Sequence, residues 1–322
     1  MRLHAHCRRR NGIKGEHMSI IRPYAVGVVI FILWWLAAGV VEVRAAESQI
    51  RRLSDGARER TYLIYRPALL SRQTAVPLIV MLHGGFGSGR QAENSYRWDA
   101  QADREGFVVA YPDGIGHSWN AGGICCGPAL REHVDDLGFL TRLIDAVTRA
   151  ENIDPRRVYL TGMSNGAAMT YRYACEGTYP LAAIGPVAGS LSFSCSRPHP
   201  VSVLAIHGLD DQHVPFAGGQ GTKGVTQGSW MPVPQTLDAF RAADDCRPPA
   251  ERRDGVLHTD TSNCAQGREV VLITLDGAGH QWPGAKSKSG IVQRILGLDP
   301  PSTAMDATTT LWNFFQGHVA QP

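Results

Sequence analysis

The chain has 322 residues, of which 43% are hydrophobic, 8% aromatic and 19% charged. This composition is typical of a globular protein and excludes a disordered chain, a collagen and a polytopic membrane protein. The formal net charge is +3, but residues 1–45 hold seven Lys or Arg side chains and two acidic ones. The remaining chain therefore has 25 basic and 27 acidic side chains, a net charge of −2. That balance offers nucleic acid no electrostatic footprint, so we expect no nucleic-acid partner.

Residues 1–45 have the pattern of a secretory signal peptide. An unbroken apolar run spans 25–41, basic residues precede it, and small residues at Val43 and Ala45 indicate cleavage after Ala45. Met18 is an alternative start, because 18–45 alone has the length of an ordinary signal. The competing interpretation is an uncleaved anchor, although the run is short for a spanning helix. We expect a secreted or periplasmic mature chain, 46–322, with no stable membrane association after cleavage.

Cysteine usage also favours export, since disulfides persist in oxidising compartments. The cysteines after the leader are Cys125, Cys126, Cys175, Cys195, Cys246 and Cys264. Sequence alone does not choose among their pairings, but Cys246 with Cys264 is the natural first pair and Cys175 with Cys195 the next. Cys125 and Cys126 would then be either bridged to each other or free buried thiols. No Cys or His cluster has metal-ligand spacing, so we expect no metal site.

Short β-rich segments alternate with helical patterns along the mature chain. The predicted strands are 61–65, 78–82, 107–111, 158–161, 182–187, 201–206 and 270–275. Apolar residues at helical spacing predict a helix after Asp135 or Asp136, either of which could cap it, and further helices are predicted at 165–175 and 307–315. Several strands are continuously apolar, as expected for a mostly parallel sheet buried on both faces. The alternation predicts one α/β domain with helices on both faces of the sheet, and 216–245 is a candidate small cap.

Gly162-Met163-Ser164-Asn165-Gly166 matches the G-x-S-x-G pattern of a nucleophilic serine. A predicted strand ends at this motif and a predicted helix begins just after it. Such a tight turn forces the serine into a strained backbone conformation, which flanking glycines allow without collision. The turn would lift the Ser164 hydroxyl out of the sheet, beside the positive end of the helix. The competing interpretation is a Gly-Ser turn without chemistry.

A serine hydroxyl needs a base to take its proton, and the base needs an acid to orient it. His280 is the candidate base, because it follows a strand on a glycine-containing loop. The other candidate histidines are His207, His213 and His258. Asp211 is the candidate acid, in an acidic loop after strand 201–206, and its neighbour Asp210 is the competitor. The resulting order Ser164, Asp211, His280 is the one expected on an α/β-hydrolase sheet.

The oxyanion hole of such an enzyme consists of backbone N–H groups, so the sequence shows it only as glycines near a strand end. The segment 82–89 (LHGGFGSG) follows strand 78–82, where one donor should arise. Gly85 or Phe86 is the candidate for that donor, and Asn165, directly after the nucleophile, is the candidate for the other. A phosphate-binding loop is excluded because no Lys-Ser/Thr pair follows these glycines.

Taken together, the motifs resemble those of secreted α/β-hydrolases of the feruloyl esterase and polyhydroxybutyrate depolymerase-like group. The resemblance covers LHGGFGSG, YPDGIGHSWNAGGICCGPA, VDDLGFL, GMSNGAAM, HGLDDQHVPF, GAGHQWPG and DATTTLWNFF, nearly the whole mature chain. It implies hydrolysis of a carboxylic ester through an acyl-enzyme, without a cofactor, and it favours Asp211 over Asp210. Trp119 and Trp282 flank the expected site and are candidates for a wall beside an aromatic acyl group or a sugar, with ordinary packing as the alternative.

The substrate is expected to be a small-molecule or polymer-derived ester. Extracellular depolymerases of solid polyester usually add a linker and a polymer-binding domain, and neither is visible here before Pro322. Soluble or oligomeric esters are therefore expected in preference to crystalline polymer. An acyltransferase on the same three residues and a non-catalytic binding protein on the same fold are the competing functions. A peptidase could also use this triad, but nothing in the sequence recommends it.

Overall fold

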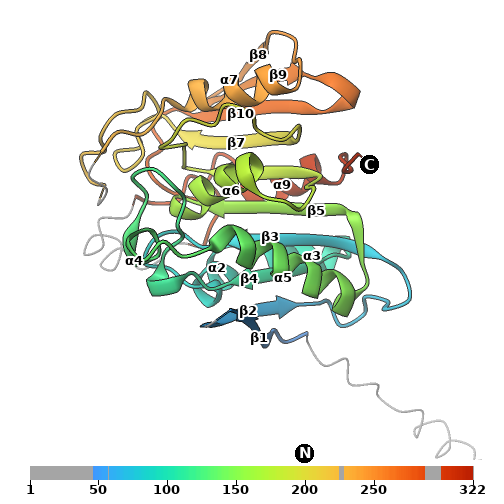
Figure 1. Ribbon diagram of the computed structural model, residues 1–322. Coiled ribbons are helices and arrows are strands. Elements are labelled where there is room, and N and C mark those ends of the chain that lie inside the picture. The colour runs from blue at the N-terminus through green and yellow to red at the C-terminus, as the bar shows by residue number, and fades with distance from the viewer. Residues whose placement is uncertain (1–45, 57, 225–227, 287–298, 322) are drawn as a thin grey trace, which may run out of the picture. The chain divides into compact units, whose positions relative to one another are not determined.

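The computed structural model describes residues 46–56, 58–224, 228–286 and 299–321, so the expected signal peptide lies outside the described residues. Within them, the strands are β1 (Gln49–Asp55), β2 (Arg58–Tyr65), β3 (Val76–Leu82), β4 (Val108–Pro112), β5 (Ile153–Met163), β6 (Ala183–Val187), β7 (Ser202–Gly208), β8 (Ala250–Asp254), β9 (Leu257–Asn263) and β10 (Glu269–Leu275). They form one sheet in the order β1-β2-β4-β3-β5-β6-β7-β10-β9-β8 (Figure 1). The strands from β4 to β10 in that order run parallel, and the outer strands β1, β2, β9 and β8 pair antiparallel.

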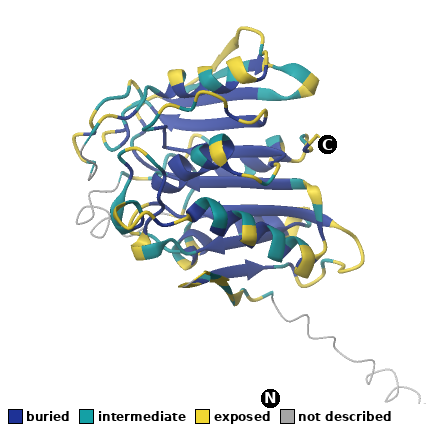
Figure 2. Cartoon of the chain, viewed as in Figure 1, coloured by how far each residue is buried: buried dark blue, intermediate teal, exposed yellow. Residues whose placement is uncertain are grey.

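Two apolar cores cover the two faces of this sheet. Strand β3 shows the alternation: Leu78, Val80 and Leu82 belong to one core, whereas Ile79 and Met81 belong to the other. The first core includes side chains of α5 (Asp136–Glu151), α6 (Asn165–Glu176) and α7 (Val233–Ala243). The second includes α2 (Gly89–Tyr96), α3 (Trp98–Glu105) and α9 (Ala307–Phe315). The central strands are buried between them (Figure 2), which confirms an α/β sheet with helices on both faces.

The local signals in the sequence explain where the main helices begin. The Asp135 carboxylate accepts the Gly138 N–H and caps α5, so Asp135 is the cap that the sequence left open with Asp136. Asp306 caps α9 in the same way, by accepting the Thr309 N–H. Helix α6 begins directly at the serine motif, with Ser164 at its N-cap position. Short helical turns, η1 (Ile115–His117), α4 (Gly127–Arg131) and η2 (Ala265–Gly267), lie in the loops.

The six cysteines from residue 46 onward are bonded in three pairs. The structure joins Cys175 to Cys195 and Cys246 to Cys264, the two pairs favoured by the sequence, and it bonds Cys125 to Cys126. No helix in the described part of the chain is long and apolar enough to cross a membrane.

The segment 216–245, the candidate cap, has two parts in the structure. Its C-terminal part is α7, whose Val233, Leu237 and Phe240 are buried in the same core as α5 and α6. Its N-terminal part includes Lys223 and Trp230, which line a cavity at the carboxyl edge of the sheet. Among the described residues of this segment, Lys223 and Trp230 therefore border the cavity, whereas α7 packs in the core.

Candidate active site

Three side chains meet where the parallel strands end. Ser164 follows β5, Asp211 lies in the loop after β7, and His280 lies in the loop after β10. The carboxyl ends of parallel strands lie at one edge of a sheet, so residues far apart in the chain converge there. The loop after β3, which holds Gly84 and Gly85, lines the same cavity.

Ser164 has a backbone conformation that few residues other than glycine adopt, with φ 58° and ψ −117°. Such strain costs about 1–3 kcal/mol and persists only where the surroundings enforce it. The surroundings here are crowded: a Cβ on Gly162 would lie 2.5 Å from the Gly166 carbonyl, and a Cβ on Gly166 would lie 2.5 Å from the Leu82 oxygen. Both glycines of the motif are therefore required by the close packing of α6 against β3 and β5.

A continuous hydrogen-bonded chain joins the three predicted residues. His280 Nε2 lies 2.8 Å from Ser164 Oγ, and His280 Nδ1 lies 2.7 Å from Asp211 Oδ2. With the proton on Nδ1 donated to Asp211, Nε2 accepts the serine O–H, which is the tautomer that a general base needs. The His280 backbone N–H also donates to Asp299 Oδ2 at 2.7 Å, so the histidine loop is held from both sides.

Asp211 is buried and fully hydrogen-bonded. Its Oδ1 accepts the backbone N–H groups of His213 and Val214, each at 2.8 Å, which leaves Oδ2 for His280. Burial raises the pKa of Asp211, but the charge and hydrogen bond of His280, the charge of His207 and the Val214 N–H together bring the pKa below its ordinary value. Asp211 is thus held ionised beside the histidine, as an orienting carboxylate must be.

The competing candidates have other contacts. His207 is buried, donates Nε2–H to the Val214 carbonyl at 2.8 Å and so braces the Asp211 loop; burial lowers its pKa. His258, half-buried near the start of β9, contacts Asp276 at 2.9 Å. His213 stacks on His280 with ring centroids 4.7 Å apart, and it lines the cavity. Asp210 is exposed, and its backbone N–H is bound to the Ala278 carbonyl.

Gly85 and Asn165 are two of the sequence candidates for donating a backbone N–H to an oxyanion. Asn165 is the first residue of α6, where backbone N–H groups have no partner within the helix. No hydrogen bond among the described residues uses either N–H. Phe86 was the other sequence candidate, and the structure corrects it: its N–H donates to the His117 carbonyl at 2.8 Å. The Phe86 side chain lines the cavity instead.

His83 shapes the Gly84-Gly85 turn from behind. Its Nδ1–H donates to the Gly84 carbonyl at 2.7 Å, and its Nε2 accepts the Gly114 N–H at 2.9 Å. Burial lowers the pKa of His83 to about 4, so the ring stays neutral and keeps one donor and one acceptor. Its backbone carbonyl accepts the Trp119 indole N–H at 2.9 Å. The loop 113–120 therefore supports the turn that carries the Gly85 N–H.

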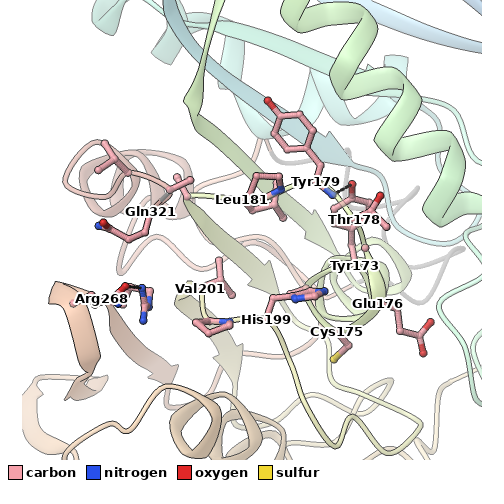
Figure 3. A pocket seen from close by; sticks show the side chains of 18 residues that line it. Tyr173, Cys175, Glu176, Thr178, Tyr179, Leu181, His199, Val201, Arg268 and Gln321 are labelled. Atoms are coloured by element: carbon pink, nitrogen blue, oxygen red, sulfur yellow. Dashed lines mark hydrogen bonds between the residues drawn. The ribbon is translucent and has the colours of Figure 1, made fainter.

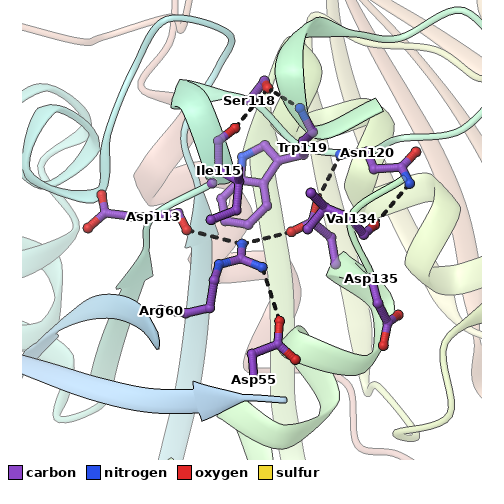
Figure 4. A network of polar contacts seen from close by, with 12 residues as sticks. Asp55, Arg60, Asp113, Ile115, Ser118, Trp119, Asn120, Val134 and Asp135 are labelled. Carbon is purple, nitrogen blue, oxygen red and sulfur yellow. Dashed lines mark hydrogen bonds and ion pairs between the residues drawn. The ribbon is translucent and has the colours of Figure 1, made fainter. Parts of the chain in front are cut away.

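An ion pair that the sequence did not indicate anchors this supporting loop (Figure 4). Arg60 of β2 and Asp136 of α5 are both fully buried and lie 2.7 Å apart. Arg60 also donates to the Asp113 carbonyl at 3.2 Å, and Asp136 accepts the Asn120 backbone N–H at 2.8 Å. The pair thus holds both ends of the loop 113–120. Burial raises the pKa of Asp136, against the opposing effect of Arg60.

A cavity of about 420 Å³ opens over Ser164, within the range of about 300–1,000 Å³ usual for small-molecule sites. Its walls include Phe86, Met163, Trp230, His280 and Trp282. Trp282 stacks on Tyr96 with ring centroids 4.6 Å apart, so one of the two predicted wall tryptophans does line the cavity. Trp119 does not: it is fully buried, its indole N–H donates to the His83 carbonyl, and its backbone N–H donates to Asn165 Oδ1.

Comparison with known proteins identifies the family. Residues 60–199 match the family described as esterase PHB depolymerase. A Nocardia uniformis subsp. tsuyamanensis protein named as an esterase, NocK, is 32% identical over 268 residues, which are 75% of this chain and 76% of that protein. The chain belongs to this esterase family.

Two fungal relatives add to this esterase assignment. Feruloyl esterase C from Emericella nidulans is 28% identical, with 71% of each chain covered. Feruloyl esterase B from Piromyces equi is 28% identical over 69% of this chain, and the match spans only 42% of that longer protein. These matches confirm the sequence-based prediction of a carboxylic-ester hydrolase of the feruloyl esterase and depolymerase-like group.

Solved structures agree on the fold of the esterase. An acetyl xylan esterase from Aspergillus awamori superposes with a TM-score of 0.53 at 15% identity, covering 77% of this chain and 99% of that one. At this identity the likeness concerns the fold alone, and it supports an α/β-hydrolase.

The sequence did not predict the Arg60–Asp136 ion pair or the hydrogen bonds that hold Trp119. These contacts join residues that are distant in the chain, so they leave no local signal in the sequence.

Proposed function

We propose that this esterase hydrolyses carboxylic esters through a serine acyl-enzyme formed on Ser164. The observation that carries the proposal is the hydrogen-bonded chain from Ser164 through His280 to Asp211, with the serine facing the cavity. His280 takes the hydroxyl proton as Oγ attacks the ester carbonyl, and then gives it to the leaving alcohol. Water repeats the attack with the same base and releases the acid.

The backbone N–H groups of Gly85 and Asn165 are proposed to bind the oxyanion in both steps. Neither N–H binds an acceptor among the described residues. Asn165 also lies at the positive end of α6, which favours a developing negative charge. Fixed donors of this kind contribute more than flexible ones because they need no reorganisation during the reaction. The His83 and Arg60 contacts are proposed to keep the Gly85 turn in place.

The substrate class that fits best is a soluble ester with an aromatic or small acyl group. The cavity wall is rich in aromatic and apolar side chains, among them Phe86, Met163, Trp230 and Trp282. Relatives named as feruloyl esterases and a fold relative named as an acetyl xylan esterase favour acylated sugars as the natural esters. We further propose that the enzyme acts outside the cytoplasm, which the signal-like leader and the three disulfides support.

Initial rates on a small ester panel test the proposal. The panel contains methyl ferulate, nitrophenyl acetate and hydroxybutyrate oligomers, assayed with the chain from Ala46 onward and with its Ser164→Ala variant. We expect hydrolysis that disappears in the variant, with the preferred ester naming the acyl group. Full activity in Ser164→Ala, or no activity of the wild type on any ester, contradicts the mechanism. Added sugar alcohols distinguish an acyltransferase, since transfer would divert the acyl group from water to the alcohol.

A further inference from the structure

The disulfide between Cys125 and Cys126 forms part of the cavity that holds Ser164. Cys125 is 1% exposed, whereas Cys126 is half-buried. The pair directly precedes the short helix α4, in the segment that connects β4 to α5. The proposed ester hydrolysis assigns these two cysteines no step, although they line the same cavity as Ser164.

Cys125 contacts the side chain of the residue after the nucleophile. Asn165 Nδ2 donates to Cys125 Sγ at 3.2 Å and to the Trp119 carbonyl at 2.9 Å, while its Oδ1 accepts the Trp119 N–H at 2.7 Å. Both ends of the Asn165 amide are therefore occupied, and the side chain is 2% exposed. Holding this side chain also fixes the first turn of α6, which carries the Asn165 backbone N–H.

We propose that the bonded Cys125–Cys126 pair positions the oxyanion hole through Asn165 and forms the apolar wall against which the acyl group packs. The inference rests on the proposed function of Ser164. A disulfide has no N–H or O–H donor, and its polarisable sulfur atoms make favourable contacts with aromatic rings. An aromatic acyl group therefore gains more from this wall than an acetyl group does.

Opening the bond removes both contributions. A dithiol reductant transfers two electrons and two protons: the S–S bond breaks, Cys125 and Cys126 become thiols, and the dithiol is oxidised to its cyclic disulfide. The two sulfur atoms are then free to separate, so Cys125 Sγ is no longer held against the Asn165 amide. Thiols also place weak S–H donors in a wall that had none.

The double variant Cys125→Ala/Cys126→Ala tests the proposal in the full chain. Turnover is normalised to active sites titrated with a fluorophosphonate. We expect kcat to fall about five- to tenfold on both methyl ferulate and nitrophenyl acetate, as for a lost positioning hydrogen bond. We also expect KM to rise about fivefold for methyl ferulate and less than about twofold for nitrophenyl acetate. The matched control is Cys246→Ala/Cys264→Ala, which removes a remote disulfide and should leave both constants unchanged.

A purely structural role predicts something else: a lower melting temperature, with kcat and KM per titrated site equal to the wild type. That result overturns the proposal, as does mass spectrometry that finds free thiols at Cys125 and Cys126 in active enzyme. If the double variant does not fold, wild-type enzyme reduced only at this pair, as verified by mass, should show the same losses and recover on reoxidation. An unchanged rate after that reduction also overturns it. A wild type without esterase activity contradicts the function of Ser164 first, so the two failures are distinguishable.

Discussion

Two pockets in the described part of the chain lie at opposite edges of the sheet, and they differ in the side chains that line them. A pocket of about 730 Å³ is lined by residues just before β6, β7 and β10, at the amino ends of those strands (Figure 3). Its charged groups pair with neighbours: Arg268 with Asp244, and Glu176 with Arg172. The cavity of about 420 Å³ at the carboxyl edge holds Ser164 and His280 instead. Position at the strand ends, not size, therefore distinguishes the candidate site.

The largest expected contrast between the two edges is in the effect on kcat of removing a hydroxyl group, from Ser164 at the carboxyl edge or from Thr178 at the amino edge. Ser164→Ala should lower kcat by about 10⁴-fold or more, because it removes the nucleophile and leaves only binding and oxyanion donors. Thr178→Ala, which removes a hydroxyl from the amino-edge pocket, should leave kcat within about twofold. Steady-state rates on the preferred ester check both. A large loss in Thr178→Ala with an active Ser164→Ala enzyme would reverse the assignment of the two pockets.

Substitution of the adjacent residues Asp211 and Asp210 tests which of them is the acid that orients His280. Asp211→Asn should lower kcat by about 10³- to 10⁴-fold, because the amide no longer holds His280 in the tautomer that accepts the serine proton. Asp210→Asn, one residue away and exposed, should retain activity within about twofold. Circular dichroism confirms that both variants fold. The opposite ranking of the two rates would transfer the role to Asp210.

Loss of the Arg60–Asp136 ion pair, which supports the carboxyl edge, should have a smaller effect on kcat and a measurable effect on stability. Arg60→Met leaves the fully buried Asp136 without its partner, which should lower the free energy of unfolding by about 3–5 kcal/mol. Because the loop 113–120 loses an anchor, kcat should also fall about tenfold with little change in KM. Arg58→Met is the matched control, since Arg58 lies on the same strand in an exposed pair with Glu132. Urea unfolding and steady-state kinetics of the two variants decide.

The parts of the structure that the sequence predicted are those with local signals. Continuous apolar runs located the central strands, and the flanking glycines located Ser164, whose strained turn only close packing explains. The outer strands β1, β8 and β9 escaped prediction because they are exposed or only half-buried and are rich in charged or polar residues. The predictions of the Phe86 N–H as an oxyanion donor and of Trp119 as a cavity wall depended on the conformation of a loop. Those outcomes are decided by His117 and Asn165, distant in sequence from the groups they bind.

The smallest expected effect is the contribution of His83, at the carboxyl edge, to the pH dependence of the free energy of unfolding. Burial lowers the pKa of His83 to about 4 in the folded protein, against about 6.5 in an unfolded chain. The unfolded state therefore binds the proton first, so this contribution to stability is complete above about pH 6.5 and is lost as the pH falls toward 4. Between about pH 7.5 and pH 5 the loss from this one group is about 2 kcal/mol.

His83→Gln removes that titration, so the difference in unfolding free energy between the two pH values should shrink by about 2 kcal/mol relative to the wild type. His199→Gln is the matched control, because it makes the same substitution at an exposed histidine of the amino edge. Urea unfolding of the three proteins at both pH values measures it. An equal pH dependence in His83→Gln and wild type would mean that His83 accepts a proton in the folded protein near its ordinary pKa. The neutral ring, and with it the Gly114 N–H bond that fixes the Gly85 turn, would then not persist at mildly acidic pH.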